Sequence, residues 1–280
     1  WGIDAKGSFA PISISLFIGS FIFGIGMQLA NGCGSGVLFS FGAGSGRMMI
    51  ALPFFIVGSL IGSLILPWAL SLGSYEQYII GKDLSTGWRA IFNIMLLGLT
   101  ALGFYIWGKI RGQTVSKSLV TGTLIIAILC ASIFLFSGHP WGITFGFTLW
   151  GAKLFNSLGV PISEFTFWTW SGPSKALKES VLANTSSVMD VGMIIGAGII
   201  ASASGYLKKA FWPQPSQLFA AAIGGLIMGI GARLAFGCNI GAFLAGTASG
   251  SLHGWIWFAM AILGSWVGIK VRPYFGFKNG

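Results

Sequence analysis

The chain has 280 residues, of which 54% are hydrophobic and only 8% are charged. A soluble domain carries about 25% charged residues, so this composition excludes a soluble globular protein, a disordered chain and, with three cysteines, a disulfide-rich secreted domain. The net charge of +10 would suit a nucleic-acid binder. However, the basic residues lie in short segments between apolar runs, which indicates a multi-pass protein of the lipid bilayer with no nucleic-acid partner.

Seven apolar runs are long enough to cross a bilayer, which requires about 20 residues per helix. They cover residues 11–31, 47–72, 87–108, 118–137, 186–206, 216–236 and 252–271. A shorter run at 141–158 contains three glycines, and it predicts a broken or re-entrant helix. The connectors 71–86 and 171–187 are polar. The predicted fold class is therefore an all-α polytopic membrane protein.

Basic clusters between the spans predict the orientation of the chain. Lysine and arginine gather at 109–117, 208–209 and 270–278, and short basic loops favour the cytoplasmic side. Spans 11–31 and 252–271 then run inward, and spans 47–72 and 216–236 run outward. The segment 138–185 enters and leaves on the outer side, as a re-entrant pair would.

An internal repeat relates FGIGMQLANGCGSG (23–36) to MGIGARLAFGCNIG (228–241) at an offset of 205, and further matches follow at 206. Because the matched spans have opposite predicted directions, we expect an inverted-topology repeat with Gly-broken, partly re-entrant helices, as in many transporters. Its halves are 1–137 and 138–280, within one transmembrane domain. Residue 141 shifted by 205 falls at −64, so we also expect the natural protein to have further N-terminal residues. The small-residue stretches 32–46 and 237–250 are expected to be non-helical and to line a cavity.

Two cysteines occupy equivalent positions of this repeat, each in the pattern Gly-Cys-x-x-Gly. Glycine lets the backbone approach a ligand closely, and a following helix start offers free N–H groups and a positive dipole end. With an S–H donor, this arrangement suits a small anion that has a soft sulfur terminus. The loop residues expected to contact the substrate are Cys33, Cys238, Gly32, Gly34, Gly36, Gly237, Asn239 and Gly241. A small buried apolar cysteine is the alternative, which we prefer for Cys130.

Charged residues within the predicted spans are candidates for function. Arg233 either balances the charge of an anion or extends to the membrane surface, and Lys153 is a second candidate to face the anion. Asp190 is expected to cap a helix or to interact with its dipole. Arg47, at the start of its span, is expected to be an anchor at the cytoplasmic edge.

We expect no metal or other cofactor. Two thiols without a nearby histidine or carboxylate fall short of a four-coordinate zinc site, and a dithiol redox enzyme would need a C-x-x-C pair. His139 and His253 are expected at the membrane interface. Six tryptophans predict an aromatic belt: Trp141, Trp150, Trp168, Trp170, Trp255 and Trp257.

The doubled G-x-G-x-x-L-A-x-G-C-x-x-G pattern, together with GHPWGITFGFTLWGAKLFNSLG (138–159), resembles the YeeE/YedE sulfur-transport family, most of all its bacterial thiosulfate transporters. The resemblance implies thiosulfate uptake across the bacterial inner membrane, without enzymatic chemistry, by cysteines that relay the ion through S–H···S hydrogen bonds. Cys33 and Cys238 match two of the family's cysteines, whereas a third, in an N-terminal helix, has no counterpart here. The resemblance also implies a small cytosolic TusA-like sulfurtransferase as partner.

Two other functions stay open at this point. The same fold would suit transport of another chalcogen species, such as a selenium compound or sulfide. A membrane thiol enzyme that transfers sulfur covalently is the third possibility, and a trapped persulfide on Cys33 or Cys238 would support it.

Overall fold

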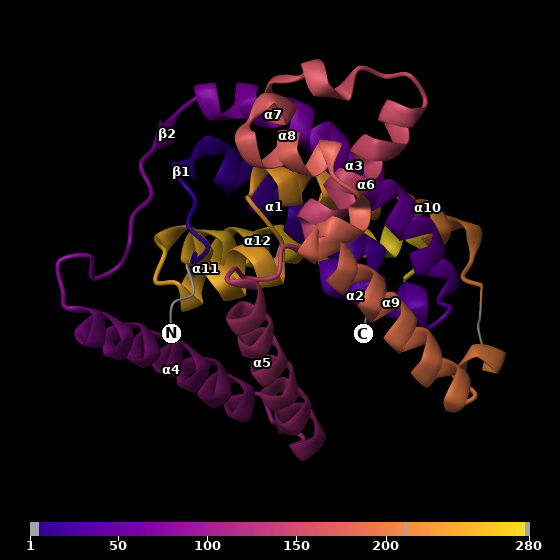
Figure 1. The fold of residues 1–280 in the computed structure, drawn as a ribbon. Coiled ribbons are helices and arrows are strands. Elements are labelled where there is room, and N and C mark those ends of the chain that lie inside the picture. The colour runs from indigo at the N-terminus through magenta and orange to yellow at the C-terminus, as the bar shows by residue number, and fades with distance from the viewer. Residues whose placement is uncertain (1–5, 210–211, 278–280) are drawn as a thin grey trace.

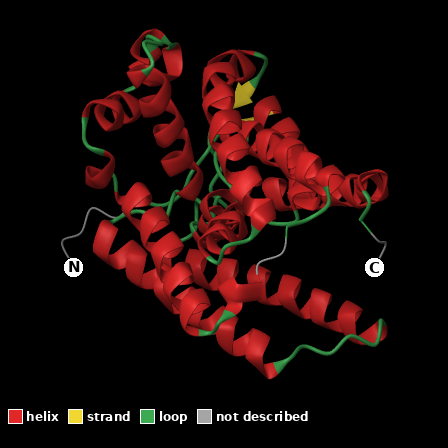
Figure 2. Cartoon of the chain, turned by 90° about the vertical axis from the view of Figure 1, so that its right-hand side faces the viewer, coloured by secondary structure: helices red, strands yellow, loops and turns green. Residues whose placement is uncertain are grey.

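The computed structural model describes residues 6–209 and 212–277, and the chain is an all-α polytopic membrane protein. Among the described residues, seven helices are long and apolar enough to cross a membrane. Figures 1 and 2 show a packed helical body, from which two of the long helices, α4 and α5, extend away.

The long helices are α1 (Ile14–Ala30), α3 (Gly46–Ser71), α4 (Thr86–Ile110), α5 (Lys117–Ser137), α9 (Thr185–Ala203), α10 (Pro215–Leu234) and α12 (Leu252–Val271). The shorter helices are α2 (Gly34–Gly42), α6 (Ile143–Ser157), α7 (Thr166–Thr169), α8 (Ser171–Lys178), α11 (Ala245–Ala248) and the π-helix η4 (Asn239–Leu244). Single 3₁₀ turns form η1 (Ile162–Glu164), η2 (Val181–Ala183), η3 (Tyr206–Lys209) and η5 (Arg272–Phe275). Two short strands, β1 (Ile12–Ser13) and β2 (Ser74–Tyr75), pair antiparallel.

The predicted spans are confirmed as helices, each with ends within three residues of the expected ones. Local chemistry sets several of these ends. The Ser13 hydroxyl caps α1 by accepting a hydrogen bond from the amide of Leu16 at 3.3 Å. Pro215 occupies the first turn of α10, where its missing N–H costs nothing. Asn31, in the left-handed conformation, ends α1.

Two expectations about irregular backbone are corrected. The run at 141–158 is not broken, because it contains one continuous helix, α6, whose glycines serve as contact points: Gly146 lies against Asp190, and Gly151 lies against Ile56 of α3. A re-entrant path for this helix stays a prediction. The stretches 32–46 and 237–250 are largely helical, since α2 and η4 begin directly after the cysteines. The free helix starts are therefore nearer to the thiols than we expected.

The body is built around α1, α3, α10 and α12, which pack through glycines on facing surfaces. In one contact, the Ser265 hydroxyl donates to the carbonyl of Gly24 at 3.3 Å. In another, the Ser59 hydroxyl donates to the carbonyl of Gly229 at 3.4 Å. The two pairs are related by the offsets of the sequence repeat, 206 for the serines and 205 for the glycines. The repeated residues therefore make repeated contacts.

Helices α1 and α10 run antiparallel at their contact. Gly19 lies against the carbonyl of Gly231, and Gly26 lies against that of Gly224, so the residue number rises in one helix as it falls in the other. Close backbone approach of this kind is typical of small-residue interfaces between membrane helices. The inverted orientation of the two halves across the bilayer, and the boundary between them, stay predictions.

An aromatic layer fills the centre of the body. Phe23 packs on Trp257 at 5.4 Å between ring centroids, and Phe55 packs on Phe147 at 4.9 Å. These four side chains are buried in one cluster that also contains Cys238. The second cysteine of the repeat thus lies in the apolar centre of the protein.

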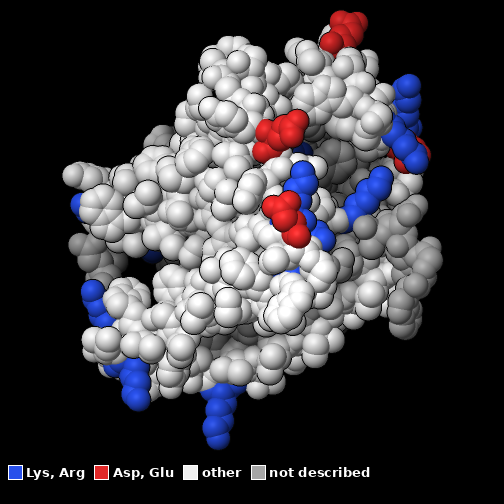
Figure 3. Space-filling view, turned by 90° about the vertical axis from the view of Figure 1, so that its left-hand side faces the viewer, with Lys and Arg blue, Asp and Glu red and all other residues white. Residues whose placement is uncertain are grey.

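Helices α4 and α5 have large exposed apolar faces, and α5 has no buried residue. The turn that joins these two helices lies at the lower end of the molecule in Figure 1. On the face drawn in Figure 3, the lower end carries only basic side chains, whereas the acidic side chains lie in the upper half. This asymmetry agrees with a cytoplasmic position for the basic turn.

Candidate functional site

Each cysteine of the repeat is the residue that immediately precedes a helix. Cys33 is the N-cap of α2, and Cys238 is the N-cap of η4. Two residues before each cysteine, the backbone turns through a left-handed residue, Asn31 with φ 61° or Phe236 with φ 60°. Equivalent sequence therefore folds into equivalent turns, and both thiols stand at helix starts.

Backbone amides surround the thiol of Cys238. The first amides of a helix have no partner within it and carry partial positive charge. In η4, the amide of Ala242 bonds the carbonyl of Cys238 at 2.9 Å. The amides of Ile240 and Gly241, which follow Cys238 at the start of η4, lie beside its thiol. An anion that reached this sulfur would also meet those two donors.

The two cysteine loops meet at Gly34. A Cβ atom at Gly34 would lie 3.2 Å from the Cys238 sulfur, and one at Gly36 would lie 3.5 Å from the Cys33 sulfur. The loop glycines thus leave just enough space for the thiols. Both cysteines are free thiols, but Cys238 is 1% exposed whereas Cys33 is half-buried. The Cys33 sulfur also lies 3.4 Å from the hydroxyl of Ser35.

The second loop is fixed from several sides. Gly237 has φ 152°, and a Cβ there would collide with the amide of Ala242. The indole N–H of Trp257 donates to the carbonyl of Gly237 at 3.2 Å, and the Ser8 hydroxyl donates to the carbonyl of Gly241 at 2.9 Å. The side-chain Oδ1 of Asn239 is buried without a hydrogen-bond partner among the described residues.

Arg233 lines a cavity of about 160 Å³ beside this loop. Its side chain is only 8% exposed, so it does not extend to the membrane surface, and this excludes one of the two expected roles. The Nη1 atom donates to the Thr148 hydroxyl at 3.4 Å, and the guanidinium lies over the rings of Phe145 and Phe167. Within the described chain Nε has no partner, so this buried cation retains a free donor.

The other wall of this cavity comes from the segment before α6 and from its first turn, with residues Pro140, Trp141, Gly142, Thr144 and Phe145. The cavity also reaches Gly237 and Gly241 of the second cysteine loop. A positive charge, loop amides and small polar groups therefore converge on one space next to Cys238. Such a space suits a small anion.

Lys153 is not part of this arrangement. Its ammonium group donates to the backbone carbonyls of Leu177 at 2.8 Å and Glu179 at 2.5 Å, at the C-terminal end of α8. A cation there satisfies carbonyls that the helix leaves free. The structure thus brings Arg233 and the loop residues together, and it places Lys153 at a different contact.

A second cavity, of about 530 Å³, lies next to the Cys33 loop. Asn31, Ser40, Arg47 and Met48 are among its lining residues, and the Arg47 Nη2 donates to Gln217 Oε1 at 2.7 Å. From its sequence position, Arg47 was expected only as an anchor. Its contact with Gln217 arises from the packing of α3 on α10, which brings together residues that are 170 positions apart.

The expected role of Asp190 as a helix cap is wrong, whereas its interaction with the helix dipole stays a prediction. The cap of α9 is Asn184, whose Oδ1 accepts from the amide of Ser187 at 3.0 Å. Asp190 instead accepts a 3.0 Å hydrogen bond from the indole N–H of Trp141, and it is fully buried. The predicted aromatic belt is wrong for the buried Trp141, Trp168 and Trp257, because their indole N–H groups bond groups inside the body. The HPWG sequence at 139–142, directly before α6, is the local feature that could have indicated a fixed position for Trp141.

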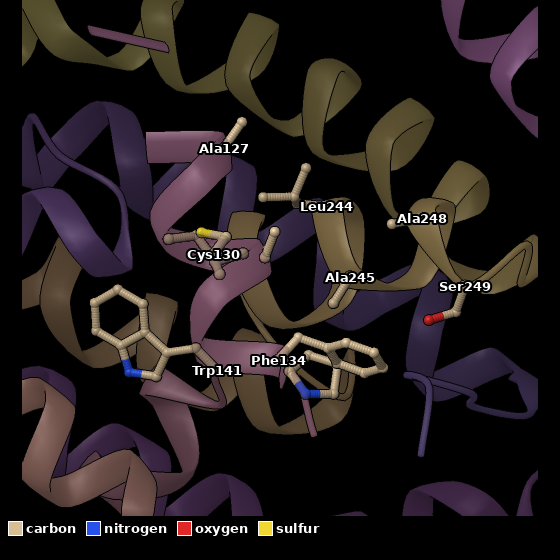
Figure 4. A pocket seen from close by; sticks show the side chains of 11 residues that line it. Ala127, Cys130, Phe134, Trp141, Leu244, Ala245, Ala248 and Ser249 are labelled. Atoms are coloured by element: carbon tan, nitrogen blue, oxygen red, sulfur yellow. The ribbon is translucent and has the colours of Figure 1, made fainter. Parts of the chain in front are cut away.

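Two further expectations are corrected. His253 is 1% exposed and contacts the Ser251 hydroxyl at 2.7 Å, so it lies inside the protein and not at an interface. Cys130 lies on α5, which has no buried residue, and its side chain lines an apolar pocket of about 320 Å³ with Phe134 and Leu244 (Figure 4). Among the described residues, no cluster of three or more metal-ligating side chains occurs.

Comparison with known proteins gives a consistent result along the chain. Residues 2–267 match the family described as Sulphur transport. The thiosulfate transporter TsuA of Spirochaeta thermophila is 28% identical over 264 residues, which cover 89% of this chain and 74% of that protein. The thiosulfate transporter TsuA of Escherichia coli is 28% identical over 280 residues, with 91% and 74% covered.

A third relative is similar over a shorter region. The Probable transporter YedE of Escherichia coli is 32% identical over 151 residues, which cover 54% of this chain and 37% of that protein. All three relatives are named as transporters and none as an enzyme.

Proposed function

The chain belongs to the sulphur transport family, and we propose that within this family it takes up thiosulfate through a path lined by its two cysteine loops. One observation carries the proposal: the thiol of Cys238 packs on Gly34, next to Cys33, so that two loops distant in the sequence meet in the core. Similarity to proteins named as thiosulfate transporters supports the choice of substrate.

The two cavities give this path a direction. With the basic loops in the cytoplasm, the Arg233 cavity lies on the outer side and the Arg47 cavity on the inner side. Thiosulfate enters next to Arg233, passes Cys238 and then Cys33, and leaves past Arg47. The residues that contact it are those of the two loops together with Arg233. Lys153 has no contact with the ion in this route, since its donors are occupied at α8.

The thiols act in this route as neutral S–H donors to the terminal sulfur of thiosulfate. A thiolate would repel a dianion strongly in a medium of low dielectric constant. A neutral thiol is a weak donor, and a transport site must bind well enough to admit an ion but weakly enough to release it. The amides of Ile240 and Gly241 supply stronger donors to the ion's oxygens.

Mutation of the cysteines tests this route. Cys33→Ala and Cys238→Ala should each abolish growth on thiosulfate as sole sulfur source, in cells without another thiosulfate importer, while the protein remains folded in the membrane. Cys130→Ala is the matched control, and it should be nearly silent because Cys130 lies on an exposed helix. Wild-type growth from either loop variant would contradict the assignment.

The alternative functions are outcomes of two further measurements. Uptake of labelled thiosulfate separates this substrate from another sulfur or selenium species. Mass spectrometry after incubation with thiosulfate should show unmodified Cys33 and Cys238. A stoichiometric persulfide that forms and decays with transport would favour covalent sulfur transfer and would reject the hydrogen-bond relay.

We also propose that the protein lies in a bacterial inner membrane and that a cytosolic protein takes over the transported sulfur. A small TusA-like sulfurtransferase would meet the path at its cytoplasmic mouth, where Arg47 and Arg272 lie with Phe277 between them. Co-purification of such a protein with the wild-type chain, lost on Arg272→Glu, would support the contact. Equal recovery with both forms would contradict this location.

Uptake of a dianion needs a source of energy. Each elementary charge that moves inward against 100 mV of inside-negative potential costs about 2.3 kcal/mol, so thiosulfate costs about 4.6 kcal/mol. Neutral thiols and loop amides change the rate of passage but do not supply this energy. Accumulation of the ion therefore requires a further driving force.

A further inference from the structure

Two charged side chains are buried among the described residues, Asp190 at 0% exposure and Arg233 at 8%. They have opposite charge, yet they do not form an ion pair. The salt bridge found in the described chain is an exposed one, between Lys175 and Glu179. Intramembrane ionisable residues are costly to bury and commonly serve ion or proton movement. Binding of an anion in the Arg233 cavity explains why Arg233 is buried. The burial of Asp190 needs a separate explanation.

Only one of the two carboxyl oxygens of Asp190 has a hydrogen-bond partner in the described structure. Its Oδ1 accepts the indole N–H of Trp141 at 3.0 Å. Its Oδ2 has no hydrogen-bond partner in the described structure and packs against Gly146 of α6, which has no side chain in the way. An unpaired buried carboxylate oxygen is strongly unfavourable. A bound proton would neutralise the group at this oxygen.

No cation neutralises Asp190 from the helices that pack on it. Helix α9 packs against α2, α6, η2 and η3. The lysines of η3 follow the C-terminal end of α9, whereas Asp190 lies near its N-terminal end. Helix α2 contributes no ionisable side chain beyond its N-cap, Cys33. The cation of α6, Lys153, is bound to α8. Arg233 reaches α6 through Thr148 and not through Asp190. The remaining titratable neighbour is Cys238, which lies in the same buried cluster as Trp141, the hydrogen-bond partner of Asp190.

The position of Asp190 close to Cys238 means that protonation of Asp190 affects the binding of an anion at the Cys238 sulfur. An anion beside the Cys238 sulfur is repelled by a negative Asp190 and is not repelled by a protonated one. By thermodynamic linkage, the anion then favours the proton as much as the proton favours the anion. Trp141 connects the two places physically, because it bonds Asp190 and also lines the Arg233 cavity.

We propose that Asp190 is the proton-binding residue that couples anion uptake to the inward proton gradient, an inference that rests on the proposed thiosulfate transport. A proton from the outer side binds Oδ2, the anion and the proton are held together at Cys238, and both are released inward. The carboxylate left behind then accepts the next proton from outside. Asp190 is the acidic residue of the described membrane-spanning helices, so the role has one candidate among acids.

Uptake in proteoliposomes tests this coupling. With one proton per ion, wild type should accumulate labelled thiosulfate about tenfold more with an outside-acidic gradient of about one pH unit than without one, at clamped voltage. Asp190→Asn keeps the acceptor for Trp141 and the side-chain size but cannot carry the proton. This variant should lose the response to the gradient, yet it should retain exchange of thiosulfate between equal pools on both sides. Glu164→Gln, which neutralises an exposed acid, is the matched control and should respond as wild type does.

The outcomes separate the two proposals. An Asp190→Asn variant that still responds to the proton gradient overturns the coupling role. A wild-type chain that exchanges thiosulfate but ignores the gradient also overturns it and leaves the substrate intact. A wild-type chain that exchanges no thiosulfate contradicts the proposed function itself.

A measurement on the wild type covers the case in which the variant does not fold. Dicyclohexylcarbodiimide modifies protonated carboxyl groups in apolar surroundings. Its adduct at Asp190, located by mass spectrometry, should block gradient-driven uptake. Uptake that still follows the gradient after full modification of Asp190 would overturn the proposal.

Discussion

Substitution of Gly34 by alanine places one methyl group between the two cysteine loops. The new Cβ would lie 3.2 Å from the Cys238 sulfur and 3.3 Å from the Cys238 Cβ, closer than ordinary van der Waals contact. Overpacking of this kind costs about 1–3 kcal/mol. If the cost falls on the state with the ion beside Cys238, it slows uptake about 5- to 150-fold. We expect a loss in this range, without loss of the folded protein.

The assay is the initial rate of labelled thiosulfate uptake in cells that have no other importer, normalised to the amount of protein in the membrane. Gly36→Ala is a comparison within the path, because its Cβ would lie 3.5 Å from the Cys33 sulfur, which is ordinary contact. It should slow uptake less than Gly34→Ala does. Gly122→Ala, on exposed α5 with no atom near the added Cβ, should be silent.

Equal uptake by Gly34→Ala and wild type would refute this reasoning. It would mean that the contact between Gly34 and Cys238 lies outside the path, or that the loops separate before the ion arrives. A loss confined to Gly36→Ala would place the constriction at Cys33 instead.

Three further predictions follow from the same structure. Arg233→Gln should lower kcat/KM for thiosulfate about 10- to 150-fold, the loss of one charge-assisted hydrogen bond, and Arg233→Lys should retain part of the activity; wild-type kinetics in Arg233→Gln would remove the cavity from the path. Single cysteines at Ser74 and Ser116 should react with an impermeant thiol reagent from outside and inside respectively, and labelling of both from one side would overturn the topology. Lys153→Met should destabilise the protein by about 1–3 kcal/mol, because it frees carbonyls at the end of α8, with KM unchanged; a raised KM with unchanged thermal stability would return Lys153 to the path.

The spans, the repeat and the two cysteine loops were predictable because their signals are local. Hydropathy over about 20 residues identifies a membrane helix without reference to its neighbours. Glycines at fixed offsets identify surfaces where backbones meet, and the pairing of Ser59 with Gly229 and of Ser265 with Gly24 agrees with that interpretation. The repeat of Gly-Cys-x-x-Gly identified Cys33 and Cys238 before their positions were known.

The roles of charged and aromatic side chains were less predictable, because they depend on which helix lies opposite. Asp190 and Lys153 each lie in a helix and are flanked in the sequence by apolar residues, so the local sequence does not distinguish their environments. Asp190 faces Trp141 and the glycine surface of α6, whereas Lys153 reaches the end of α8. These partners lie 49 and 24 residues away in the chain.

By itself, the sequence of this protein determined that it spans a membrane, which segments cross, and which two thiols are equivalent. Only the tertiary structure decided that Cys238 packs on Gly34, that Arg233 remains inside next to a cavity, and that Asp190 is buried with one free oxygen. The physical reason is the distance along the chain over which each effect acts. Hydropathy and backbone propensity act along the chain, whereas the environment of a buried charge is set by residues that packing brings from distant segments.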